Sequence, residues 1–204
     1  MAEKVVVPSS QCTNVPDGLD DITAAAIAIP GMSSWVALKE RTKFAAGETV
    51  LVNGATGASG RLAVQVAKYL GAKKVIATRR RAAALQSIKA LGADETILLV
   101  ENREALENAF KEQFAGGVDV VLDYLWGQSA ECLLTAGSKA GTAAPISLIQ
   151  IGTAGGTNIT LPGAILRSAP IELMGSGLGS AYRSIALLGQ SNKYCGRQSQ
   201  ATLK

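Results

Sequence analysis

From residue 49 onward, short apolar runs alternate with amphipathic segments of helical spacing. The run Thr49–Asn53 is β-branched and apolar on both faces, which is typical of a buried parallel strand. After it, Leu62, Val66 and Leu70 share one helical face, and Gly71 stands where a helix ends. The same pattern predicts further strands at 74–78, 96–99, 118–122, 146–151 and 171–174, with helices between them. The chain is therefore predicted to be α/β, with a doubly wound, six-stranded parallel sheet in a three-layer αβα arrangement.

The first 45 residues have a less regular pattern. We predict a short strand near residues 5–7 and a helix from about residue 22 to 29, which an aspartate at 20 or 21 would cap. Pro30 should break this helix, because proline lacks the backbone donor that a helix interior needs. A second helix is predicted from about residue 33 to 41.

The composition excludes several kinds of chemistry. Of the 204 residues, 48% are hydrophobic and 18% are charged, enough apolar material for a sizeable core. There is no histidine, which excludes Ser-His-Asp and Cys-His nucleophile pairs and any zinc site that uses histidine. Cys12, Cys132 and Cys195 are far apart in the sequence, so we expect neither a disulfide framework nor a metal site.

Charge and hydropathy do not indicate a nucleic-acid-binding surface or a membrane-spanning segment. The net charge of +4 arises in residues 175–204, which hold four basic residues and no acidic one, so the rest of the chain is neutral. The longest uncharged run, residues 140–166, is interrupted by prolines and glycines. No apolar signal core follows the N-terminus, and we expect a soluble, cytoplasmic protein.

A glycine-rich loop lies between the first buried strand and the first long helix. Its residues are Gly54, Ala55, Thr56, Gly57, Ala58, Ser59 and Gly60, with the spacing G-x-x-G-x-x-G. Glycines permit a tight turn and close approach of a pyrophosphate, and the N-terminus of the helix offers free N–H groups and positive potential. In this position the loop predicts a Rossmann-type nucleotide site, because a plain turn would not need three glycines.

The end of the second strand indicates which nucleotide binds. NAD sites usually have an acidic residue here that accepts hydrogen bonds from the ribose hydroxyls, but no acid occurs between Gly60 and Asp94. Instead Thr78 is followed by Arg79, Arg80 and Arg81. Guanidinium groups match a 2′-phosphate, so we favour NADP(H) over NAD, the alternative being three solvated arginines.

Several motifs together indicate one family. They are GETVLVNGATGASG at 47–60, AVQVAK at 63–68, LGAD at 91–94 and VDVVLD at 118–123. With them the chain resembles the zinc-independent quinone oxidoreductase branch of the medium-chain dehydrogenases/reductases over about residues 3–180. The resemblance implies an enzyme that uses NADPH to reduce quinones, enones or related carbonyl compounds without a metal.

The resemblance also implies a domain organisation. Residues 46–178 would be the NADP-binding domain, and residues 1–45 a hinge with a remnant of the catalytic domain that such enzymes carry at their N-terminus. Residues 179–204 form a tail of foreign composition, and we expect the sheet to fold without it. A homodimer through the edge strand 171–174 is expected, unless the tail covers that edge.

By this resemblance, residues 57–60 would hold the pyrophosphate, and Arg79 or Arg80 the 2′-phosphate. Ser33, Gly152, Thr153 and Gly175 would border the nicotinamide. The candidate cofactor-binding residues are thus Ser33, Gly54, Ala55, Thr56, Gly57, Ala58, Ser59, Gly60, Thr78, Arg79, Arg80, Gly152, Thr153 and Gly175.

Two hypotheses about function stay open. The chain is either an NADPH-dependent oxidoreductase, or the cofactor half of one, or it is a non-catalytic NADP(H)-binding sensor or interaction module. No residue is assigned as catalytic. Tyr124 follows a strand end and would place a phenol near a substrate, but we interpret it as part of the site wall.

Overall fold

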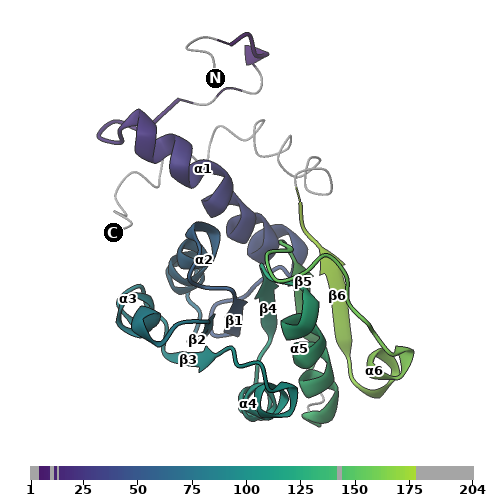
Figure 1. The fold of residues 1–204 in the computed structure, drawn as a ribbon. Coiled ribbons are helices and arrows are strands. Elements are labelled where there is room, and N and C mark those ends of the chain that lie inside the picture. The colour runs from purple at the N-terminus through teal and green to yellow at the C-terminus, as the bar shows by residue number, and fades with distance from the viewer. Residues whose placement is uncertain (1–4, 10–11, 13, 142–143, 178–204) are drawn as a thin grey trace.

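The predicted parallel sheet is present. The computed structural model describes residues 5–9, 12, 14–141 and 144–177. Within them six strands occur: β1 (Thr49–Asn53), β2 (Lys74–Arg79), β3 (Glu95–Leu98), β4 (Val120–Asp123), β5 (Ile146–Gln150) and β6 (Ile171–Gly175). All neighbours pair in parallel, in the order β3-β2-β1-β4-β5-β6 (Figure 1). The order reverses between β1 and β4, which confirms the doubly wound fold and places a crevice at the carboxyl ends of these two strands.

Helices cover both faces of this sheet (Figure 1). They are α2 (Ala58–Tyr69) and α3 (Leu85–Lys89) on one face, α4 (Arg103–Ala115) and α5 (Gly127–Lys139) on the other, and the short α6 (Gly163–Ser168) before β6. The alternation of side chains in β1 creates both cores. Val50 and Val52 pack on the α2 side, whereas Leu51 packs with Phe110 of α4 and Leu133 of α5. Because both faces are covered, β1 is buried along its whole length, as its apolar sequence predicted.

The N-terminal helix is longer than predicted. Asp20 caps it, because its Oδ1 accepts a hydrogen bond from the backbone N–H of Thr23 at 2.9 Å. From there α1 (Asp21–Val36) runs through Pro30 and continues as a π-helical turn, Ala37–Arg41. The predicted break at Pro30 is therefore wrong. Proline removes one backbone donor, but α1 packs against α2, and this packing holds the chain helical on both sides of the proline.

Two further expectations concern the N-terminal region and the tail. The strand predicted at residues 5–7 is wrong: these residues are exposed and lie outside the sheet, so they have no ladder partner. The tail at 179–204 lies outside the described residues.

Among the described helices, Asp21–Arg41 alone is long and apolar enough to cross a membrane, and 22% of its most apolar window is buried. The absence of a membrane span stays a prediction.

Ionic contacts join the helices on the α4 and α5 side. Arg103 at the start of α4 donates to Glu107 at 3.0 Å and to Glu131 of α5 at 2.7 Å. Glu131 also accepts a hydrogen bond from the backbone N–H of Thr160 at 2.7 Å. The Thr160 N–H, and after it Arg103, lowers the pKa of the Glu131 carboxyl. Glu131 therefore stabilises the folded chain in its ionised form.

Candidate functional site

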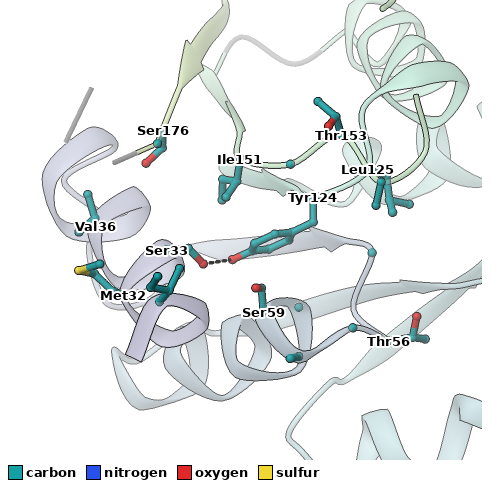
Figure 2. A pocket seen from close by; sticks show the side chains of 18 of the residues that line it. Met32, Ser33, Val36, Thr56, Ser59, Tyr124, Leu125, Ile151, Thr153 and Ser176 are labelled. Atoms are coloured by element: carbon teal, nitrogen blue, oxygen red, sulfur yellow. Dashed lines mark hydrogen bonds between the residues drawn. The ribbon is translucent and has the colours of Figure 1, made fainter. Parts of the chain in front are cut away.

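A cavity of about 570 Å³ lies at the carboxyl ends of β1, β4 and β5, where the sheet topology predicts a ligand site. The turn after β1 and the first residues of α2 border it on one side (Figure 2). The second half of α1 and the segments after β4, β5 and β6 form the other walls. Its volume is in the range of small-molecule and cofactor sites.

The turn between β1 and α2 brings backbone against backbone. Gly54 has a φ of +97°, a conformation that favours glycine. A Cβ on Gly60 would lie 2.2 Å from the carbonyl oxygen of Gly54, so no side chain fits there. Gly57 is the N-cap of α2 and makes no side-chain capping hydrogen bond. The first N–H groups of α2 therefore lie at the cavity without a side-chain cap, and the positive end of the helix dipole favours an anion.

A network of buried polar side chains holds this turn in place. The Thr78 hydroxyl accepts from the backbone N–H of Gly54 at 2.8 Å and donates to Asn53 Oδ1 at 2.9 Å. The Asn53 amide in turn donates to Asp123 Oδ1 at 2.8 Å and to Ser129 Oγ at 3.0 Å. Asn53, Thr78 and Asp123 are fully buried. The ends of β1, β2 and β4 are thus joined beneath the glycine loop, and Thr78 supports the loop instead of lining the cavity.

Asp123 also shapes the turn between β4 and α5. Its carboxylate accepts hydrogen bonds from the backbone N–H groups of Leu125 at 3.0 Å and Trp126 at 3.1 Å. Trp126 has φ 60° and ψ −154°, which residues other than glycine rarely adopt, and the bond to Asp123 helps to hold it there. Burial raises the pKa of Asp123, although these N–H groups and the Asn53 amide counteract it. The turn directs Tyr124 and Leu125 into the cavity.

The segment after β5 packs directly against this turn. A Cβ on Gly152 would lie 2.6 Å from the carbonyl oxygen of Tyr124, so only glycine permits the contact. Further along, the backbone N–H of Gly155 donates to the carbonyl oxygen of Leu125 at 2.7 Å. These contacts place Thr153 on the cavity wall near Leu125 (Figure 2).

Tyr124 extends from the end of β4 toward α1 (Figure 2). Its hydroxyl oxygen lies 3.2 Å from Ser33 Oγ, and the Ser33 hydroxyl donates to the carbonyl oxygen of Pro30 at 2.7 Å. Burial raises the pKa of Tyr124 to about 12, although the nearby hydroxyls of Ser33 and Ser34 act in the opposite direction. The phenol is therefore neutral near pH 7.

The structure separates the two arginines that the sequence grouped together. Arg80 is exposed and lines the cavity. It also borders a second cavity of about 210 Å³, which lies between the segment after β3 and the turn after β4. Arg79 is directed elsewhere: its Nε donates to Thr96 Oγ1 of β3 at 3.4 Å, and its Nη1 is buried with no hydrogen-bond partner in the described chain. Of the two, Arg80 is the one placed to meet a ligand in the larger cavity.

Ten of the fourteen candidate residues line the cavity. They are Ser33, Gly54, Thr56, Gly57, Ala58, Ser59, Gly60, Arg80, Gly152 and Thr153. Ala55 is buried in the core, Thr78 and Arg79 lie as described above, and Gly175 borders a separate cavity of about 400 Å³. The sequence prediction missed the lining residues Ile29, Met32, Val36, Leu125 and Ala154. The apolar ones carry no local signal that distinguishes them from core residues.

The arrangement can hold an elongated anion. Positive potential gathers where α2 begins and at Arg80, whereas Ile29, Met32 and Val36 of α1 and Ile151 supply an apolar wall at the other end. Within the described residues, no group of three or more histidine, cysteine, aspartate or glutamate side chains could hold a metal ion.

Comparison with known proteins gives consistent similarities. Residues 58–189 match the protein family described as zinc-binding dehydrogenase. The chain is 37% identical over 179 residues to a probable NADPH-dependent quinone reductase, tdiC, of Emericella nidulans, an alignment that covers 81% of this chain and 49% of that protein. It is 30% identical over 171 residues to a quinone oxidoreductase-like protein 2 homolog of Nematostella vectensis, covering 81% of this chain and 44% of the relative.

A solved structure shows the same likeness. The quinone oxidoreductase of Thermus thermophilus, whose structure was also determined in complex with NADPH, superposes with a TM-score of 0.73 at 32% identity. The superposition covers 93% of this chain and 57% of that enzyme. The chain thus spans about half the length of the relatives that it matches.

Proposed function

Because the chain belongs to the zinc-binding dehydrogenase family, we propose that it is the NADP(H)-binding part of an oxidoreductase that reduces quinones or related carbonyl compounds. The observation that carries the proposal is the cavity in which the N-terminus of α2 and Arg80 meet an apolar wall. The likeness to a quinone oxidoreductase solved with NADPH supports NADP(H) as the cofactor.

The residues present fit this cofactor. The close approach of Gly60 to Gly54 leaves room for a pyrophosphate on the first N–H groups of α2. Arg80 would hold the 2′-phosphate of the adenosine ribose, since a guanidinium forms charge-assisted hydrogen bonds to phosphate. The smaller cavity beside Arg80, with Leu99, Leu106 and Leu125 in its walls, would take the adenine.

The residues present do not fit the zinc ion of the family's description. The chain has no histidine, and its described residues offer no metal-binding cluster, so no step of the proposal involves zinc.

In this proposal the protein binds and orients, and the bound NADPH supplies the hydride. Ser33, Gly152 and Thr153 would border the nicotinamide. Gly152 lets the segment after β5 pack against the backbone of Tyr124, which keeps this part of the cavity in shape. The apolar side chains of Met32 and Ile151 would limit the access of water to the reacting ring.

Titration with NADPH and NADH, followed by assays of NADPH oxidation with a panel of quinones and enones, tests the proposal. We expect NADPH to bind more tightly than NADH, and turnover with at least one acceptor. Binding without turnover would favour the alternative of a non-catalytic NADP(H)-binding module. A chain that binds neither NADPH nor NADH would refute both the proposed function and this alternative.

A further inference from the structure

Two serine hydroxyls of α1 lie beside the phenol of Tyr124. The Ser33 hydroxyl donates to the carbonyl oxygen of Pro30 at 2.7 Å, and the Ser34 hydroxyl donates to that of Gly31 at 3.0 Å. In these two hydrogen bonds each serine is the donor to a carbonyl oxygen of its own helix. The lone pairs of Ser33 Oγ are left to accept hydrogen bonds from elsewhere.

Either oxygen could supply the hydrogen between Tyr124 and Ser33, and we assign it to the phenol because the Ser33 hydroxyl lies closer to the carbonyl oxygen of Pro30. The Tyr124 and Ser33 hydroxyl oxygens are 3.2 Å apart, and the Ser33 hydroxyl donates its hydrogen to the carbonyl oxygen of Pro30. Burial raises the pKa of Tyr124 to about 12, so the phenol keeps its hydrogen at neutral pH. The phenol oxygen thus donates toward Ser33 and retains lone pairs of its own, which makes it a hydrogen-bond acceptor and not a poised acid.

The apolar surroundings of the Tyr124 oxygen make it important for ligand binding. Tyr124 lines the same cavity as the apolar side chains of Met32 and Val36 on α1 and of Ile151 after β5 (Figure 2). A ligand group that enters this apolar end and carries an N–H donor is stabilised by pairing with the phenol oxygen. A group without a donor leaves the oxygen unpaired, which costs free energy in a buried place.

We propose that the phenol oxygen of Tyr124 accepts a hydrogen bond from the primary amide of the nicotinamide and so orients the ring. The inference rests on the proposed function. The two phosphate sites lie at Arg80 and the N-terminus of α2, so the nicotinamide is left to the end of the cavity where Tyr124 meets Ser33. Ser33 is a positioning residue, because it fixes the direction of the Tyr124 hydrogen.

The test compares three ligands on the wild-type chain and on Tyr124→Phe. They are NADP⁺, its 3-acetylpyridine analogue, which has an acetyl group without N–H donors, and 2′-phospho-ADP-ribose, which lacks the ring. We expect Tyr124→Phe to weaken NADP⁺ binding about 2- to 10-fold, the usual effect of one hydrogen bond. Binding of 2′-phospho-ADP-ribose should stay unchanged, and the acetyl analogue should bind as tightly as before or more tightly, because the oxygen that it left unpaired is gone. 2′-Phospho-ADP-ribose controls for any change in the shape of the cavity.

Each other outcome contradicts a specific step. An equal loss for NADP⁺ and its acetyl analogue, a loss for all three ligands, or no loss at all would overturn the role of Tyr124 while leaving the proposed function intact. A wild-type chain that binds none of the three ligands would refute the proposed function itself.

A second variant tests the assignment of the hydrogen. Ser33→Ala leaves the phenol oxygen but no longer fixes its hydrogen, so we expect a smaller loss, again for NADP⁺ alone. The double variant should bind NADP⁺ no more weakly than Tyr124→Phe, because Ser33 acts through Tyr124. Additive losses would overturn the assignment.

Discussion

Replacement of Arg80 by alanine should reduce the affinity for NADPH selectively. Arg80 is the arginine of the 79–81 cluster that lines the cavity, and it borders the smaller cavity as well. Hydrogen bonds to charged groups contribute about 1.5–3 kcal/mol, which corresponds to a roughly 10- to 100-fold change in affinity. Because Arg80 is exposed and solvent screens its charge, we expect a loss near the lower limit, about 10-fold. The affinity for NADH, which has no 2′-phosphate, should change little.

The neighbouring arginines provide matched controls, since each carries the same charge. Arg81 is exposed and lies outside both cavities that Arg80 borders, and Arg79 is held against Thr96 of β3. Arg79→Ala and Arg81→Ala should therefore keep most of the affinity for NADPH. The measurement is calorimetric or fluorescence titration with both nucleotides at one fixed ionic strength. Equal losses for NADH and NADPH in Arg80→Ala, or a larger loss in Arg79→Ala, would refute the assignment of Arg80 to the phosphate.

Three further predictions concern the loop, pH and assembly. Gly60→Ala should lower the melting temperature and weaken NADPH binding, because its Cβ would lie 2.2 Å from a backbone oxygen, whereas Gly57→Ala has open space and should keep the melting temperature. Glu131→Gln should lower the free energy of unfolding by about 1 kcal/mol at pH 7. The hydrogen bond from Thr160 N–H, then Arg103, lowers the pKa of Glu131, so this stabilisation is present above pH 4.5 and lost as the pH falls through the folded-state value; an equal loss at acidic pH would contradict it. We also expect a homodimer through the edge strand Ile171–Gly175, and a monomer mass in light scattering at micromolar concentration would contradict this.

The local sequence pattern was sufficient to predict a strand where both faces of that strand are buried, because burial on both faces requires apolar residues throughout. The strand Thr49–Asn53 was predicted with the bounds that the structure has, because a strand covered on both faces must be apolar throughout. The prediction was wrong at Pro30, where contacts between α1 and α2 outweigh a local preference. It was also wrong at residues 5–7, where an apolar run has no strand beside it.

The order of strands and helices, the glycine loop and the cluster of arginines could all be read from the sequence, since each depends on neighbours a few residues apart. Which arginine borders the cavity could not, because Arg79 and Arg80 project differently from the end of one strand. The same holds for Ser33 and Tyr124, which are 91 residues apart in the chain and meet because α1 packs beside the end of β4. Their hydrogen bond has no local signal, since its two partners belong to separate elements of the fold. The parts of this site come from the ends of five strands and from α1. Only tertiary packing brings these parts together, because they lie far apart in the sequence.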